Sequence, residues 1–478
     1  MGADERGPSA VRSVAVTAED VLAALEARRQ RDAPVVLRMM PPYSGRMRAR
    51  LHVRAGGDDP RAVPEQERRR DRNNSRQRSG ELRDVTCPRR RTTDGKSRRT
   101  RARRNRYAGR GPTTTVLREV HEEHGAIFGE RGGREVVAEY GRPERSHGAV
   151  RKVVGVIEQP YDVLVVTGDD RVEYVDNAVS NTVSDVDGTG TYALLLTPQG
   201  HIRTGMYVYN AGERLLVFLP PGKGDPIAGD WREKTFIQDV DIDVATDEFA
   251  VFGVHGPKAT EKIASVFAEG TPEESLSFVR GPMGDVGVTV IRTDAPTGEE
   301  GYEVVAVTSD AVDVFDTLVN RGLNAAPFGY RAWETLTLEA GTPLFESELD
   351  GHLPNDLGLR NAVDFEKGCF VGQEVVSRVE NRGQPGNRLV GLVAEEVPEG
   401  GAAVFEGDEA VGEITRAVES PSRSVPIAFA LVDYGIGDRV GDDAALSVRI
   451  DGQEREATAV ELPFLEGSER SGRLPRYP

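Results

Sequence analysis

The chain changes character near residue 112. Residues 1–112 contain 29 Lys and Arg against 14 Asp and Glu, whereas the remaining 366 residues contain 32 basic and 64 acidic side chains. Between Gly56 and Gly111 apolar residues show almost no periodicity, and Arg clusters recur among Asn, Ser, Gln and Thr. Such a stretch buries too little apolar surface to offset the entropy of ordering it. The main folded body is therefore expected to begin near Thr114.

The N-terminal 112 residues divide into two predicted segments. Residues 1–54 form a short α/β-like segment of unknown role, with a helix capped by Thr17 and one or two strands within Pro34–Val53. Residues 55–112 form an Arg-rich disordered segment, for which a shifted reading frame, a solvated linker and a nucleic-acid arm remain open. Tyr107 is the single aromatic residue between Gly56 and Gly111. Nucleic-acid binding is disfavoured because aromatic side chains are needed to stack on bases.

From Thr114 to about residue 385 the pattern mixes strands that pair through turns with helices, without strict βαβ alternation. This predicts an α+β fold with antiparallel sheets. Beyond Arg388, six short strands at barrel-like spacing predict a separate C-terminal β-barrel. The predicted domains of this body are residues 113–240, 241–385 and 386–466, followed by a disordered tail over 467–478.

Composition excludes several protein classes. Two cysteines, Cys87 and Cys369, exclude a disulfide scaffold and suit a reducing cytoplasm. No apolar run approaches the ~20 residues that a bilayer requires, and Met1–Ala10 does not read as a signal peptide. We expect a soluble, cytoplasmic protein. The acidic excess of the body favours a halophilic, haloarchaeal source, with an acidic face for a basic partner as the alternative.

The stretch Lys367-Gly368-Cys369-Phe370-Val371-Gly372-Gln373-Glu374 places one of the two thiols between glycines. Lys367 lies two residues before Cys369, and a nearby ammonium would favour the thiolate. The other interpretation is a small buried apolar residue in a glycine-rich turn. His121 and His124 form a possible metal pair on one helix face, but a third ligand is not evident and we predict no metal site.

Lys367–Glu374 resembles the K-G-C-[FY]-x-G-Q-E signature of the YgfZ-like folate-binding proteins, a branch of the family that includes the glycine-cleavage T-protein (aminomethyltransferase). Further stretches resemble motifs of the same family and occur in the same order: Phe252–Ala259, Thr297–Glu303, and Gly329–Arg331 through Leu338–Gly341. The resemblance covers about residues 114–465. It implies two folate-binding domains followed by the barrel.

The resemblance implies tetrahydrofolate as cofactor and a role in the assembly or repair of iron–sulfur clusters, with iron–sulfur proteins as partners. It implies that Glu299, Arg331, Lys367 and Gln373 contact the folate and that Cys369 is the reactive group. A carboxylate at Glu299 would suit the adjacent N–H donors of a pterin. Tyr330 and Trp333 are candidates to stack on a flat ring or to pack in the core.

Two other functions remain open. One is a true aminomethyltransferase that makes methylenetetrahydrofolate, and the other is a folate-binding module without chemistry. The T-protein carries an acidic pair after a glycine-rich turn, and its catalytic work is assigned there. Aligning Gly200–Arg203 with that turn places Thr204 and Gly205 where the acids would be. This departure puts aminomethyl transfer by the usual acid in doubt.

Overall fold

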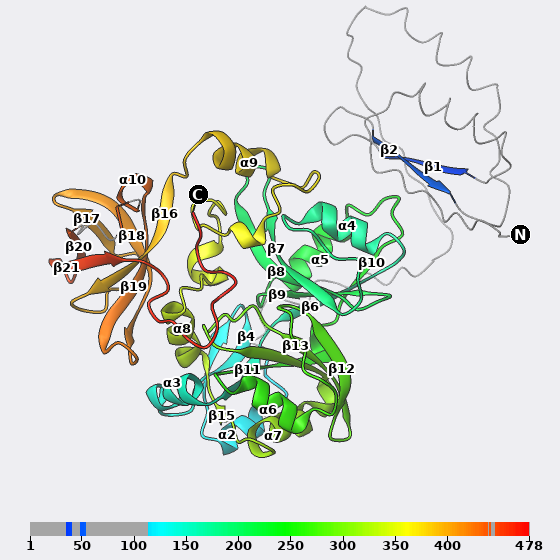
Figure 1. Cartoon of the computed structure of the whole chain (residues 1–478), viewed down its shortest axis with the longest axis horizontal. Coiled ribbons are helices and arrows are strands. Elements are labelled where there is room, and N and C mark those ends of the chain that lie inside the picture. The colour runs from blue at the N-terminus through cyan, green and yellow to red at the C-terminus, as the bar shows by residue number, and fades with distance from the viewer. Residues whose placement is uncertain (1–34, 41–47, 54–112, 438, 441–444, 478) are drawn as a thin grey trace, which may run out of the picture. The chain divides into compact units, whose positions relative to one another are not determined.

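The computed structural model describes residues 35–40, 48–53, 113–437, 439–440 and 445–477 (Figure 1). The chain divides into two compact units, Met1–Arg103 and Arg104–Pro478. In the first unit, β1 (Val35–Met40) and β2 (Arg48–Val53) pair as an antiparallel hairpin, in agreement with the strands predicted there. The predicted helix at Thr17 and the segment 55–112 lie outside the described residues.

The second unit contains a five-stranded antiparallel sheet, the first sheet, in the order β10-β6-β9-β8-β7. Two helices cover one face of it. Most side chains of its central strands are buried, because both faces of the sheet are covered there. The elements are β6 (Asp162–Thr167), α4 (Arg171–Ala178), β7 (Thr189–Leu196), β8 (Ile202–Asn210), β9 (Leu215–Leu219), α5 (Gly224–Arg232) and β10 (Asp241–Val244).

A six-stranded sheet, the second sheet, has the order β12-β13-β14-β11-β5-β15, and only its β15–β5 pair is parallel. Its outer face packs against α6 and α7, as the apolar stripe Val314, Phe315, Leu318 and Val319 requires. The elements are β5 (Gly155–Gln159), β11 (Phe249–His255), α6 (Ala259–Val266), β12 (Phe278–Met283), β13 (Val286–Arg292), β14 (Gly301–Val307), α7 (Ala311–Asn320) and β15 (Ala326–Pro327).

The two sheets face each other across one apolar core. Tyr192, Leu194 and Tyr207 of the first sheet belong to the same buried cluster as Val251 and Val305 of the second. Figure 1 shows the first sheet with α4 above the second sheet with α6 and α7. The predicted boundary at residue 240 separates these layers only in part, because β5, before that boundary, lies inside the second sheet.

Several short elements, most of them not predicted, surround the sheets. Those at the start of the unit are α2 (Arg118–Glu123), β3 (Ile127–Arg131), β4 (Arg134–Glu139) and α3 (Pro143–Lys152). Later come α8 (Tyr330–Glu339) and α9 (Gln373–Arg382). No helix in the described part of the chain is long and apolar enough to cross a bilayer.

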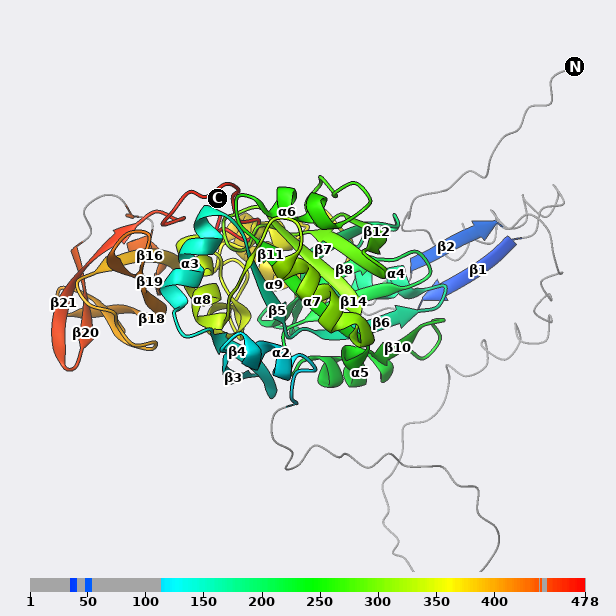
Figure 2. The same ribbon diagram turned by 90° about the horizontal axis from the view of Figure 1, so that it is seen from below.

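The C-terminal domain is the expected β-barrel. It is closed, in the order β16-β19-β18-β17-β20-β21, and an apolar cluster fills it. Figure 2 shows it at one end of the unit, next to α3 and α8. Its elements are β16 (Asn387–Ala394), β17 (Ala403–Glu406), β18 (Glu409–Ser420), β19 (Val425–Asp433), α10 (Tyr434–Gly437), β20 (Ala445–Ile450) and β21 (Gln453–Val460).

The segment after the barrel corrects one prediction. Residues 467–477 were expected to form part of a disordered tail, yet they return along the two-sheet body. Backbone amides of Glu469, Gly472 and Arg476 donate to carbonyls of the body, and Leu474 is buried. Its few apolar residues, spaced among charged ones, gave no periodic signal. Contacts with distant parts of the chain order this segment.

Candidate functional site

A cavity of about 110 Å³, partly open to solvent, lies between the two sheets beside α8. Seven of its sixteen lining residues are aromatic, and they come from the first sheet, from the β5–β6 loop, from α8 and from the segment after α8: Tyr161, Tyr192, Tyr207, Phe218, Tyr330, Trp333 and Phe345. Tyr330 and Trp333, predicted to stack on a flat ring or pack in the core, therefore reach the cavity. A planar ligand is the natural occupant of such a wall.

A buried carboxylate, Glu303 of β14, does not line this cavity itself but contacts its wall through Tyr161. Tyr161, which lines the cavity, donates a hydrogen bond of 2.7 Å from Oη to Glu303 Oε1. Glu303 Oε2 has no hydrogen-bond partner among the described residues. Desolvation raises the pKa of Glu303 to about 7, against the opposing hydrogen bond from Tyr161. A buried acceptor without a partner is costly and suggests that a ligand donor completes it.

A buried donor complements that acceptor. Gln159 Oε1 accepts a hydrogen bond of 2.8 Å from Tyr330 Oη, and Gln159 Nε2 has no partner among the described residues. In the second sheet, Gly253 pairs with Ile157 on one side and with Glu303 on the other. Because strand side chains alternate, Gln159 and Glu303 project from the same sheet face. One face thus presents an unpartnered donor and an unpartnered acceptor.

Glu299, the predicted pterin contact, lies elsewhere. It is 3% exposed, and its Oε1 accepts a hydrogen bond of 3.0 Å from Arg151. Its Oε2 accepts hydrogen bonds from the backbone amide and the hydroxyl of Ser468, at 2.9 and 2.6 Å. Both oxygens are therefore used by the protein, and Glu299 does not line the cavity.

Arg331 also points away from the cavity. Its side chain is 64% exposed at the start of α8 and pairs with Glu139 of β4. The adjacent Tyr330 and, two residues later, Trp333 line the cavity instead. Neighbouring helical residues point in different directions, so Tyr330 and Trp333 face the cavity while Arg331 does not.

Lys367 secures the end of a helix. Its buried Nζ donates to the carbonyls of Asp176, Val179 and Asn181 at 2.7 to 3.1 Å, and to Asp176 Oδ1 at 3.1 Å. Burial lowers the pKa of Lys367, and Asp176 partly offsets this. These carbonyls lie at the C-terminal end of α4, where a cation is favourable. The ammonium therefore binds the C-terminal end of α4.

The rest of the Lys367–Glu374 stretch supports the turn between β7 and β8. Gly372 has φ of 82°, and a Cβ there would lie 2.6 Å from the carbonyl oxygen of Thr197. Gln373 donates within the stretch, from Nε2 to the Lys367 carbonyl at 3.3 Å. The thiol of Cys369 is exposed, and neither Cys369 nor Gln373 lines the cavity. A nucleophilic role for Cys369 stays a prediction.

Thr204 and Gly205, aligned with the acidic pair, differ in orientation. Thr204 pairs with Leu195 and shares its face, which α4 and α5 cover. Gly205 lines the cavity. A Cβ at Gly205 would lie 2.3 Å from Tyr192 Oη, so the phenol fills the space that a side chain would need. Neither position presents a carboxylate to the cavity.

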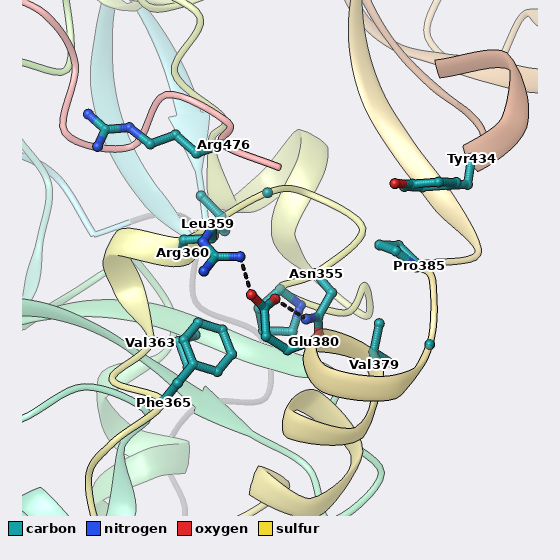
Figure 3. Close-up of a pocket in the computed structure, with 13 residues that line it drawn as sticks. Asn355, Leu359, Arg360, Val363, Phe365, Val379, Glu380, Pro385, Tyr434 and Arg476 are labelled. Carbon is teal, nitrogen blue, oxygen red and sulfur yellow. Dashed lines mark hydrogen bonds and ion pairs between the residues drawn. The ribbon is translucent and has the colours of Figure 1, made fainter. Parts of the chain in front are cut away.

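A second cavity of about 140 Å³ lies where α9, the barrel and the C-terminal segment meet (Figure 3). Figure 3 shows Glu380 between Arg360 and Asn355, and Glu380 forms an ion pair with Arg360 and accepts from Asn355 Nδ2 at 3.3 Å. Asn355 Oδ1 is the one buried side-chain atom of this wall without a partner among the described residues. Its charges largely satisfy one another, so the cavity between the sheets is the stronger candidate.

Comparison with known families agrees with the fold. Residues 117–367 match the GCVT N-terminal domain, and residues 387–466 match the glycine cleavage T-protein C-terminal barrel domain. The first match alone spans more than half of the chain. The chain belongs to the glycine-cleavage T-protein family. Residues 1–82 match a domain of unknown function (DUF8009), which favours a translated segment over a shifted reading frame there.

Relatives within the T-protein family span the body of the chain. The aminomethyltransferase of Cutibacterium acnes is 31% identical over 372 residues, which cover 74% of this chain and 98% of that protein. The probable aminomethyltransferase of Halobacterium salinarum is 29% identical over 373 residues, covering 74% and 99%. The crystal structure of glycine cleavage system aminomethyltransferase T from Bartonella henselae shares the fold, with a TM-score of 0.68, 21% identity and coverage of 74% and 98%.

The sequence contained a signal for the missed carboxylate. Glu303 is the lone charged residue in the stretch Tyr302–Val307, whose other members are apolar or aromatic. A buried strand rarely keeps an isolated carboxylate without a role. Gln159 and Tyr161 could not be singled out in the same way, because they lie on either side of the turn residue Pro160, where polar side chains are common.

Proposed function

We propose that this T-protein family member binds tetrahydrofolate in the cavity between the two sheets and transfers a one-carbon unit to or from it. The observation that carries the proposal is Glu303, a buried carboxylate with one oxygen left unpartnered beside an aromatic cavity. A pterin offers adjacent N–H donors and a ring carbonyl. Glu303 would accept from the donors and Gln159 Nε2 would donate to the carbonyl.

The relatives favour an aminomethyltransferase-like reaction over a role in iron–sulfur cluster assembly. Proteins named aminomethyltransferase match almost over their whole length. The iron–sulfur role is supported by the Lys367–Glu374 stretch alone, and that stretch lies outside the cavity lining. We also infer a high-salt cytoplasm as the working environment, from the acidic excess of residues 113–478 and from the likeness to the Halobacterium salinarum protein.

Titration of the full chain with tetrahydrofolate tests the proposal. Wild type is compared with Glu303→Gln, which keeps the shape but removes the charge. Loss of one charge-assisted hydrogen bond is expected to weaken affinity by about 10- to 100-fold. Glu374→Gln, on the exposed face of α9, is the matched control and is expected to bind as wild type does.

Thermal unfolding of each variant shows whether it remains folded. Equal affinity of wild type and Glu303→Gln would contradict the assignment of the pterin site. No binding by wild type would contradict the proposed function as a whole.

A further inference from the structure

Beside Gly205, the cavity wall carries a phenol in place of a carboxylate. The position aligned with an acid of the T-protein has no side chain, and Tyr192 Oη fills the space where a Cβ would be, at 2.3 Å. Tyr192 is 8% exposed and lines the cavity. A phenol therefore stands where the resemblance places a carboxylate.

Arg473 of the C-terminal segment accompanies Tyr192. Its guanidinium carbon lies 5.1 Å from the centre of the Tyr192 ring and 5.8 Å from that of Tyr207. Arg473 Nε and Asp294 Oδ2 form a buried ion pair at 3.1 Å, although the contact does not have hydrogen-bond geometry. The other oxygen of Asp294 accepts from Tyr207 Oη at 2.8 Å. Arg473 lines the cavity and Asp294 does not.

We propose that Tyr192 and Arg473 bind the one-carbon donor or acceptor of this enzyme, and that this compound carries a carboxylate at that point rather than a protonated amine. The inference rests on the proposed function and names the substrate class of the same cavity. It adds a charge preference that the family match does not supply.

The available hydrogen-bonding groups carry the argument. A guanidinium offers only donors, in a planar fork that matches a carboxylate, and a phenol adds a further donor. An ammonium needs acceptors, and the guanidinium of Arg473 offers none. Asp294 already pairs with Arg473, Glu346 pairs with Arg131, and Glu303 is assigned to the pterin. An ammonium beside Tyr192 and Arg473 would therefore add a cation where the nearby carboxylates are already used, which is unfavourable.

Two small probes of opposite charge test this preference. Acetate and methylammonium are titrated separately into the full chain saturated with tetrahydrofolate, and binding is followed by saturation-transfer NMR. We expect acetate to bind and methylammonium not to bind. Arg473→Gln is expected to weaken acetate binding about tenfold or more, the effect of losing a charge-assisted hydrogen bond.

Two further variants keep the test decisive. Tyr192→Phe retains the ring and is expected to weaken acetate binding as well. Arg470→Gln, in the same segment but paired with Glu466 on the surface, is the control and is expected to behave as wild type. Binding of methylammonium in preference to acetate, or acetate binding unchanged in Arg473→Gln, would overturn the proposal.

Tetrahydrofolate affinity is measured first in the same samples. A chain that fails to bind the folate contradicts the proposed function. A chain that binds it but shows no preference for acetate contradicts only the inference about charge.

Discussion

At the scale of single residues, the site depends on which side chains the fold leaves unpartnered. Glu299 and Glu303 stand four positions apart in one motif, yet Arg151 and Ser468 use both oxygens of Glu299. Glu303 keeps one oxygen unpartnered beside the cavity. The motif in the sequence predicted the correct stretch, but burial and the packing of a distant segment decide which carboxylate is available.

The titration of Glu303 predicts how folate affinity depends on pH. Its pKa is raised to about 7 in the empty protein, and the proposed contact requires the ionised form. Affinity is therefore expected to fall as pH drops below about 7, because a proton must then be removed before the ligand binds. Isothermal titration between about pH 6 and 8.5 checks this. Glu303→Gln should show a flatter profile, and identical profiles would contradict the assignment.

A second prediction concerns the packing of Tyr192 on Gly205. Gly205→Ala is expected to reduce the free energy of unfolding by about 1–3 kcal/mol, because its Cβ would lie 2.3 Å from Tyr192 Oη. Tyr192→Phe removes that oxygen and should recover part of the loss in the double variant. Chemical denaturation of the four proteins measures the coupling. Simple additivity would contradict the packing.

At the scale of elements, buried ion pairs join segments that are distant in sequence. Glu339 of α8 accepts hydrogen bonds from His147 and Arg151 of α3 and from Ser420 and Ser422 of the barrel. Most helices and strands of the sheets and barrel could be predicted from local periodicity. The C-terminal segment, α3 and the β3–β4 hairpin could not, because contacts such as these, rather than local pattern, hold them.

Glu339→Gln tests this junction. Burial opposes ionisation, but the hydrogen bond from His147 and the charge of Arg151 outweigh it and lower the pKa of Glu339 to about 2. A lowered pKa in the folded state stabilises the fold above the unfolded value of about 4.5, and the benefit is lost as pH falls toward 2. The variant is expected to lose about 3 kcal/mol at pH 7, measured by denaturant unfolding. The deficit should shrink between about pH 4.5 and 2, and a constant deficit would contradict the account.

At the scale of the whole molecule, charge is distributed very unevenly. Residues 113–478 carry 64 acidic and 32 basic side chains, and the two-sheet body with its barrel lies within this range. Like charges on one compact body repel each other. The charge balance could be read directly from the sequence, whereas the cavity could not, because its wall is assembled from both sheets, α8 and the C-terminal segment.

Salt is therefore expected to stabilise the protein. Screening lengths fall from about 10 Å at 0.1 M to about 3 Å at 1 M, which reduces repulsion between surface carboxylates. The Tm of the fragment 113–478 should rise over this range in KCl. A second series in choline chloride separates screening from specific binding of K⁺. A Tm that stays constant or falls would contradict the role assigned to the acidic surface.

The most direct test of the central claim is a crystal structure of the chain with tetrahydrofolate bound. The account predicts a pterin between the two sheets, with Glu303 Oε2 accepting its N–H groups and Gln159 Nε2 donating to its carbonyl. Ligand density in the cavity of Figure 3, beside Asn355, or a pterin that leaves Glu303 without a contact, would contradict it.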